Sequence, residues 1–295
     1  MSKNLLIRGL QTGVVSGCVL VLISVDAHHA APWQAGPAMK EDLANDHIKK
    51  AKEAYDTKRF RVAKEEAQRA LKLKKDSPEA NLLLALAYRN LNKPKDSLKY
   101  AKEAVKYRQE YADAHYLLAV LLYDKNELEP ASAELSRAIS QGARFSNAYV
   151  LKGTLELLAG RNQSALQTYK EALKLASPND ALLPQLRERA TALENYIEFT
   201  THRSNASLKG PVLLNFPAPR YTEAARQNRV QGAVRAAVLI NEQGTVNSVI
   251  LLSHLGWGLD EEAIIAVQRL KFSPATRDAK PVSFWKPVLI EFNLR

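Results

Sequence analysis

The chain has almost no cysteine, since Cys18 is the single one among 295 residues. A disulfide framework needs pairs of thiols and a thiolate metal site needs several, so both are excluded. The six histidines, at positions 28, 29, 47, 115, 202 and 254, have no metal-ligand spacing apart from the adjacent pair 28 and 29. We therefore expect no metal and no other cofactor.

Motifs of catalysis are missing as well. The sequence shows no glycine-rich phosphate loop, no nucleophile elbow and no pair of carboxylates placed for acid–base chemistry. We expect a protein that is not an enzyme.

Long apolar runs are absent after residue 25. An uncharged stretch from Gly9 to Val25 follows Lys3 and Arg8, and a polar segment comes after it. This order is typical of an export signal, with cleavage after Ala27, and predicts a periplasmic protein. Retention as an inner-membrane anchor is the first alternative, although 17 residues span only about 26 Å of a core ~30 Å thick.

Lipidation of Cys18 is the second alternative for this N-terminal segment. Val15-Ser16-Gly17-Cys18 resembles the box at which bacterial lipoproteins are cut, but apolar residues 19–23 follow it, where a mature lipoprotein usually begins with polar ones. All three alternatives carry the rest of the chain across a membrane.

The chain is basic, with 42 Lys and Arg against 31 Asp and Glu and a net charge of +11. The excess is spread along the sequence, and no basic motif is interleaved with aromatic residues. We therefore expect no nucleic acid partner; attraction to an acidic membrane surface explains the charge equally well.

Small residues recur with a period of 34 in the first two-thirds of the chain. Close helix crossings need small side chains, so a fixed period of them is typical of a solenoid of stacked helix pairs. Three sets keep the step: Ala51, Ala85, Ala119, Gly153; Ala63, Ser97, Ala131, Ala165; and Ala70, Ala104, Ala138, Ala172.

This period, with bulky apolar residues between the small ones and Pro78 and Pro178 at unit boundaries, resembles the tetratricopeptide repeat family. The resemblance covers about residues 44–176 as four units. Residues 180–200 look like a closing helix, so we predict an all-α repeat domain over 44–200, after a linker at 28–43.

The resemblance implies that a peptide or protein binds in a concave groove lined by the first helix of each pair. Tyr88 and Tyr149 have the alternative of packing between helices, and we expect His115 to face solvent rather than a ligand. The groove candidates are Asn81, Tyr88, His115, Tyr116 and Tyr149.

The pattern changes after residue 200. Residues 201–216 have the composition of a linker, and alternating apolar residues then predict a hairpin, 234–240 and 246–252, closed by a turn at Gly244. We expect Asp260 to cap a helix and a last strand to run from about 282 to 293. This pattern predicts a small α+β domain over 217–295.

Short motifs occur along this region. They are Pro219-Arg220-Tyr221, Ala225-Arg226, Gly232-Ala233-Val234, Gly244-Thr245-Val246, Gly258-Leu259-Asp260, Ala263, Phe272-Ser273-Pro274-Ala275, Lys280-Pro281-Val282 and residues 288–294. Together, and in this order over 217–295, they resemble the C-terminal domain of TonB, the periplasmic energy-transducing protein of Gram-negative bacteria. Thr222 stands where the family usually has proline.

The resemblance implies a three-stranded antiparallel sheet that captures a segment of an outer-membrane transporter as an added strand. The edge would be the last strand, and the alternative is that some of its side chains simply form the core. The candidates there are Phe284, Trp285, Lys286, Val288, Ile290 and Phe292.

The resemblance to a full transducer ends at the N-terminal part of the chain. Ser24 and His28 have the spacing of the family's Ser-x-x-x-His pair but lie at the exit of the apolar run, and there is no proline-rich spacer. Three functions follow as alternatives: an exported adaptor with one protein partner for each domain, a membrane-anchored energy transducer, or a structural scaffold of the envelope. A homodimer through the C-terminal sheet also stays open.

Overall fold

The computed structural model describes residues 36–143, 146–201 and 207–294. The expectations for residues 1–27, including Cys18, Ser24 and the cleavage site, lie outside the described residues, as does the pairing of Ser24 with His28. No helix in the described ranges is long and apolar enough to cross a membrane.

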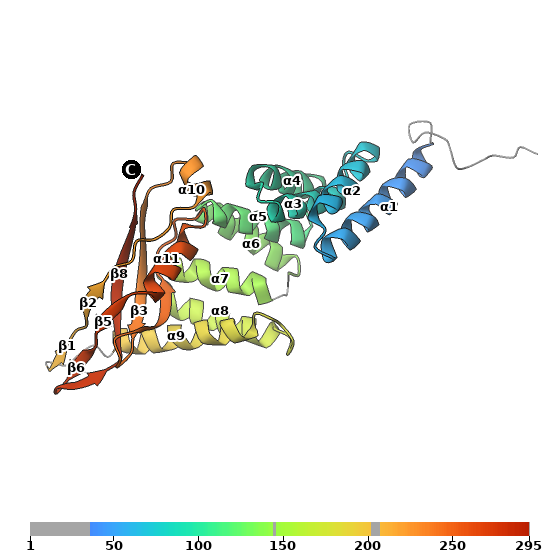
Figure 1. The fold of residues 1–295 in the computed structure, drawn as a ribbon. Coiled ribbons are helices and arrows are strands. Elements are labelled where there is room, and N and C mark those ends of the chain that lie inside the picture. Colours follow the sequence, from blue (N-terminus) through green and yellow to red (C-terminus); the bar gives the residue numbers. More distant parts are fainter. Residues whose placement is uncertain (1–35, 144–145, 202–206, 295) are drawn as a thin grey trace, which may run out of the picture.

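Within the described residues, eight helices form four antiparallel pairs, which confirms the predicted solenoid (Figure 1). A ninth helix closes it. They are α1 Pro37–Asp56, α2 Phe60–Leu73, α3 Pro78–Asn90, α4 Pro94–Tyr107, α5 Ala112–Asp124, α6 Leu128–Ser140, α7 Ser146–Leu158, α8 Asn162–Leu175 and α9 Leu183–Thr201. Residues 37–43, expected to belong to a linker, form the first two turns of α1.

The periodic small residues lie where the helices cross. Ala51, Ala85 and Ala119 are fully buried, as are the members of the other two sets. At Gly153 a Cβ atom would lie 2.6 Å from Cε1 of Tyr169. The fourth pair therefore accommodates the Tyr169 ring of its second helix because its first helix has glycine at the facing position.

The turns inside the helix pairs carry a second repeat that the sequence analysis missed. Lys58, Asn92, Asn126 and Gly160 lie 34 residues apart, and each has a positive φ, between 55° and 75°. Glycine and asparagine tolerate this left-handed conformation best, so Lys58 is the least suited of the four.

The C-terminal domain has the predicted three-stranded antiparallel sheet, with strand order β4-β3-β8. Two smaller sheets, β1-β6-β7 and β2-β5, flank it, and β1 and β2 lie in the segment expected to be a linker. The elements are β1 Leu208–Lys209, β2 Val212–Asn215, α10 Glu223–Gln227, β3 Gly232–Ile240, β4 Val246–Leu251, α11 Leu259–Gln268, β5 Lys271–Ser273, β6 Ala275–Arg277, β7 Lys280–Val282 and β8 Phe284–Phe292.

The core of this domain lies between one face of the sheet and α11. Val234, Val238 and Ile240 of β3 alternate toward it, and Leu259 and Val267 of α11 meet them. Asp260 does not cap the helix as expected: Gly258, with a φ of 77°, takes that position because the chain must turn sharply before α11. Asp260 instead accepts hydrogen bonds from the preceding loop, from the amides of Leu255 and Gly256.

The two domains share one apolar cluster. Ala237 of β3, Ile250 of β4 and Trp285 of β8 belong to the same buried cluster as residues of α8 and α9. The second face of the sheet therefore covers the closing helix of the solenoid, and the chain forms a continuous body from α1 to β8 (Figure 1).

Candidate partner-binding surfaces and the domain junction

Two predicted groove residues have side chains engaged inside the solenoid. Asn81 is buried and donates from Nδ2 to the carbonyl oxygen of Ser77 at 2.8 Å. His115 was expected to face solvent, but it is 5% exposed, with Nδ1 at 2.6 Å from Oε2 of Glu134. That expectation is wrong, because the ring joins the two helices of its own pair.

The same histidine–carboxylate bond occurs two units earlier. His47 Nδ1 lies 2.7 Å from Glu66 Oε2, and each of the four residues is 68 positions from its counterpart. Such a repeated contact between α1 and α2, and again between α5 and α6, indicates a role in packing.

The three predicted tyrosines are partly buried. Tyr88 stacks on Tyr100 with ring centroids 5.6 Å apart, and its hydroxyl accepts from Nε2 of Gln68 at 3.2 Å. Burial raises the pKa of Tyr116, and Tyr149 packs on the clusters around α7. Their exposed parts keep them as candidates for contact with a partner.

The predicted sheet edge is β8, and the strand register shows which of its N–H and C=O groups point away from the sheet. Ala237 pairs with Pro287 in an unbroken antiparallel ladder. Proline has no N–H, so this must be a non-hydrogen-bonded pair, in which both residues turn their main-chain groups away from each other. By alternation, the N–H and C=O groups of Leu289 and Glu291 also point to the outer edge, whereas those of Ile290 point to β3.

Most of the predicted edge side chains belong to the core. Phe284 packs on Phe199 of α9 at 5.1 Å, and Trp285 on Tyr196 at 5.3 Å. Ile290 and Phe292 are 1% exposed, and Lys286 and Val288 are partly buried. A strand added at β8 would therefore meet main chain and the exposed Leu289 more than these side chains.

A polar contact also joins the domains, at the C-terminal end of α5. The amide of Trp257 donates to the carbonyl oxygen of Asp124 at 2.9 Å, and Nε2 of His254 lies 2.6 Å from that of Tyr123. Gly256 lets the loop approach, since a Cβ atom there would lie 2.6 Å from the Asp124 oxygen. We call residues 252–258 the docking loop.

His254 lies at the centre of this contact. Its ring stacks on Tyr123 at 4.0 Å, and Nδ1 lies 3.0 Å from Oδ2 of Asp260, with both side chains almost fully buried. Burial favours the neutral ring, but Asp260 and the Tyr123 carbonyl outweigh it and raise the pKa of His254. Burial likewise opposes the charge of Asp260, yet His254 and the loop amides hold the pKa of Asp260 below its usual value.

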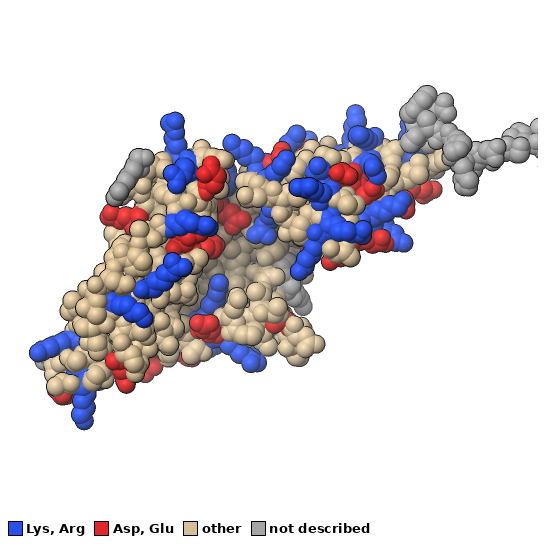
Figure 2. All heavy atoms as spheres, in the orientation of Figure 1, with Lys and Arg blue, Asp and Glu red and all other residues tan. Residues whose placement is uncertain are grey.

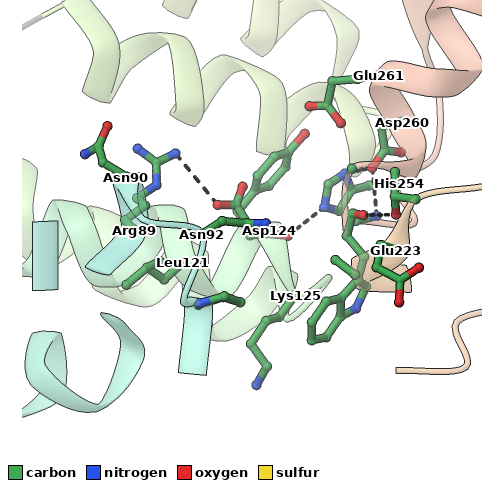
Figure 3. A pocket seen from close by; sticks show the side chains of 17 residues that line it. Arg89, Asn90, Asn92, Leu121, Asp124, Lys125, Glu223, His254, Asp260 and Glu261 are labelled. Carbon is green, nitrogen blue, oxygen red and sulfur yellow. Dashed lines mark hydrogen bonds and ion pairs between the residues drawn. The ribbon is translucent and has the colours of Figure 1, made fainter. Parts of the chain in front are cut away.

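A cleft of about 570 Å³ opens beside the docking loop, between α3, α5, α10 and the start of α11 (Figure 3). Arg89 faces Asp124 across it, with Nη2 and Oδ2 3.7 Å apart. Burial, aided by Glu261, raises the pKa of Asp124 although Arg89 opposes the shift. No group of three or more residues able to hold a metal occurs in the described ranges.

The junction was not foreseen from the sequence. His254, Trp257 and Trp285 lie on the predicted α+β domain, and nothing local indicates that they meet distant residues of the solenoid. The one available signal was Trp285, a large apolar residue on the face of the last strand opposite Ile290.

Comparisons with known proteins agree with this architecture. Residues 48–105 and 82–143 match the family model of the tetratricopeptide repeat, and residues 217–294 match that of the Gram-negative bacterial TonB protein C-terminal. The chain thus carries tetratricopeptide repeats followed by a TonB C-terminal domain.

One curated relative is the Protein TonB of Vibrio cholerae serotype O1, 32% identical over 102 residues. The match covers 32% of this chain and 42% of the relative, so it spans about two fifths of that protein. It indicates a role related to the TonB family and a place in the cell envelope, and tetratricopeptide repeats indicate protein–protein interaction.

Solved structures similar to the chain include MamA, with 18% identity and a TM-score of 0.42 over 56% of this chain and 97% of that one. PilF of Pseudomonas aeruginosa has 19% identity and a TM-score of 0.45 over 56% and 78%. A tetratricopeptide repeat protein of Thermus thermophilus has 24% sequence identity and a TM-score of 0.43. The match covers 52% of this chain and 82% of that one.

Proposed function

We propose that this protein is a non-enzymatic adaptor of the bacterial periplasm. Its repeats hold one protein partner, and its C-terminal domain binds an extended segment of an outer-membrane receptor or another envelope protein. Neither repeats of this kind nor TonB-type domains are typically catalytic, which supports an interaction role.

The open edge of β8 is the observation that carries the second half of the proposal. In the described part of the chain the sheet ends at β8, and its outer side has no paired strand. Pro287 removes one donor from this edge and so divides it. An added strand would use the part beyond Pro287, where Leu289 and Glu291 turn their main-chain groups outward and Leu289 is 49% exposed.

Leu289→Pro tests strand addition, because it removes an outward N–H and leaves the β3–β8 bonds in place. The probes are synthetic peptides that copy the periplasm-facing segments of the source organism's outer-membrane transporters. Losing a main-chain bond and gaining a steric clash should weaken binding, measured by fluorescence anisotropy, by roughly tenfold or more.

Leu289→Ala is the matched control, since it keeps the N–H while removing the side chain. It should bind within about threefold of the unaltered protein, given that affinity comes mainly from the main chain. Equal binding by a folded Leu289→Pro protein would contradict strand addition.

A membrane-anchored energy transducer is the second candidate, and the shared core favours it. Because β8 packs on α9 through Trp285 and Phe284, a pull on the sheet would pass directly into the solenoid. Intact mass and membrane fractionation of the native protein separate the two functions. A soluble species beginning near residue 28 supports the adaptor, and a full-length membrane-held species, inactive once residues 9–25 are exchanged for a cleavable signal, supports the transducer.

A further inference from the structure

The contacts between the domains are of two kinds. The apolar contact between the sheet and α9, through Trp285 and Tyr196, contains no group that titrates near neutral pH. The docking loop reaches α5 through two hydrogen bonds, from Trp257 N–H and from His254 Nε2. Only the second contact has a charge state that can change under physiological conditions.

The geometry at His254 favours the protonated ring. The Tyr123 carbonyl oxygen, 2.6 Å away, can only accept, so Nε2 must carry a hydrogen. In a neutral ring this leaves the lone pair of Nδ1 3.0 Å from Oδ2 of Asp260, with no hydrogen bond between the two atoms. A proton on Nδ1 replaces this contact by an ion pair.

The carbonyl groups at the end of α5 act in the same direction. They form the negative end of the helix dipole, where a cation is stabilised. Other charged groups also line the site: Asp124 at the end of α5, Lys125 directly after it, Arg89 from α3, Glu223 from α10 and Glu261 from α11. Arg89 faces Asp124 and Lys125 bonds to Glu127, so neither cation is directed at the imidazole.

We propose that the docking loop is a proton-controlled latch, closed when His254 is charged and loosened when it is neutral, with the apolar contact on α9 as the permanent hinge. Opening would uncover the ends of α5 and α7, where Tyr123 and Leu158 line a hollow together with β4 and α11. The C-terminal domain thus covers part of the solenoid's own surface, and pH sets how firmly.

The direction of the pH dependence follows from the two pKa values. The pKa of His254 is raised above 6.5 in the docked state, so its contribution is complete below the pKa of the free imidazole and is lost as pH rises through the docked value. Asp260 remains ionised in this range because its pKa is lowered from 3.8. The latch is therefore firm in mild acid and weakens in mild alkali.

Amide hydrogen exchange of the full chain, corrected for the intrinsic effect of pH, tests the latch. From about pH 5.5 to pH 9, protection of residues 252–258 should fall relative to that of β8, by about tenfold for each unit by which docking raises the pKa of His254. His254→Gln keeps a donor for Tyr123 but does not titrate, so it should remove the pH step.

His115→Gln is the matched control, because His115 also meets a carboxylate but lies inside the solenoid. It should leave the step unchanged. A constant protection ratio in the unaltered protein, or a step that persists in His254→Gln, would overturn the proposal. Should His254→Gln fail to fold, an NMR titration of the His254 ring decides instead: a pKa at or below 6.5 refutes the latch and a higher one supports it.

Discussion

The solenoid and the C-terminal domain solve the same packing problem in different ways. Each helix pair reuses contacts 34 residues from the last, so Ala85, Ala119 and their equivalents are buried for the same reason. The C-terminal domain uses each contact once: the contact of Trp285 with α9 has no counterpart elsewhere in the described part of the chain. Figure 2 adds a difference in surface, because Lys and Arg side chains crowd the part formed by α1–α4. The difference teaches that packing contacts which repeat can be predicted from a sequence, whereas a contact made only once leaves no pattern there.

Breaking the shared core should have the largest effect. Trp285→Ala removes a ring that is 3% exposed and lies between the domains, which should cost about 3–5 kcal/mol of unfolding free energy. Denaturant unfolding followed by circular dichroism should then separate into two transitions, because the solenoid and the C-terminal domain no longer stabilise each other.

Trp257→Ala is the control for this change, since that ring lines the open cleft and is only partly buried. It should leave a single transition near the original midpoint. An unchanged midpoint for Trp285→Ala would mean that the domains are stable independently.

A smaller effect comes from making one repeat unit like its neighbours. Gly153→Ala places a methyl group against the Tyr169 ring, which should destabilise the protein by about 1–3 kcal/mol despite the better helix propensity of alanine. Adding Tyr169→Leu gives the combination found in the third pair, Ala119 with Leu135, and should recover most of the loss. Thermal unfolding of the single and double variants measures this, and additive losses would contradict the compensation.

The smallest effect lies in the repeated turn. Lys58 has a φ of 59°, at the position where the other pairs have asparagine or glycine. Lys58→Asn should raise the unfolding free energy by up to about 1 kcal/mol, because it relieves left-handed strain without altering a buried contact. Lys64→Asn on the same helix pair is the comparison, since it lies within α2 and should not stabilise; an equal gain from both would exclude the turn as the cause.

Most of the fold could be predicted from the sequence, and the reason is periodicity. The step of 34 predicted the helix pairs, and alternation followed by a glycine turn predicted β3 and β4, because each of these patterns has a fixed spacing along the chain. The function of Asp260 could not be predicted in this way: its acidic side chain before an apolar helix looks like a cap, whereas it binds the docking loop.

The candidate sites were predicted less completely than the fold. The last strand was placed at the sheet edge, where β8 lies, but the outward direction of Leu289 follows only from its register with β3. Asn81 and His115 were predicted as groove residues because they are polar and lie on the first helix of a pair. In the structure both are buried and bond to Ser77 and Glu134, which the sequence alone does not indicate. Contacts such as His254 with Tyr123 join distant parts of the chain and cannot be inferred from spacing.

The apolar contact between the sheet and α9 also limits how the chain can be cut or recombined. A fragment ending after α9 would present bare Leu193 and Tyr196 to water, and a fragment beginning near residue 207 would do the same with Trp285 and Ile250. Exchanging the last domain for that of a relative would carry the same penalty unless the surface facing α9 came with it. The two domains look like interchangeable modules in the sequence, but their shared apolar cluster means that each needs the matching surface of the other.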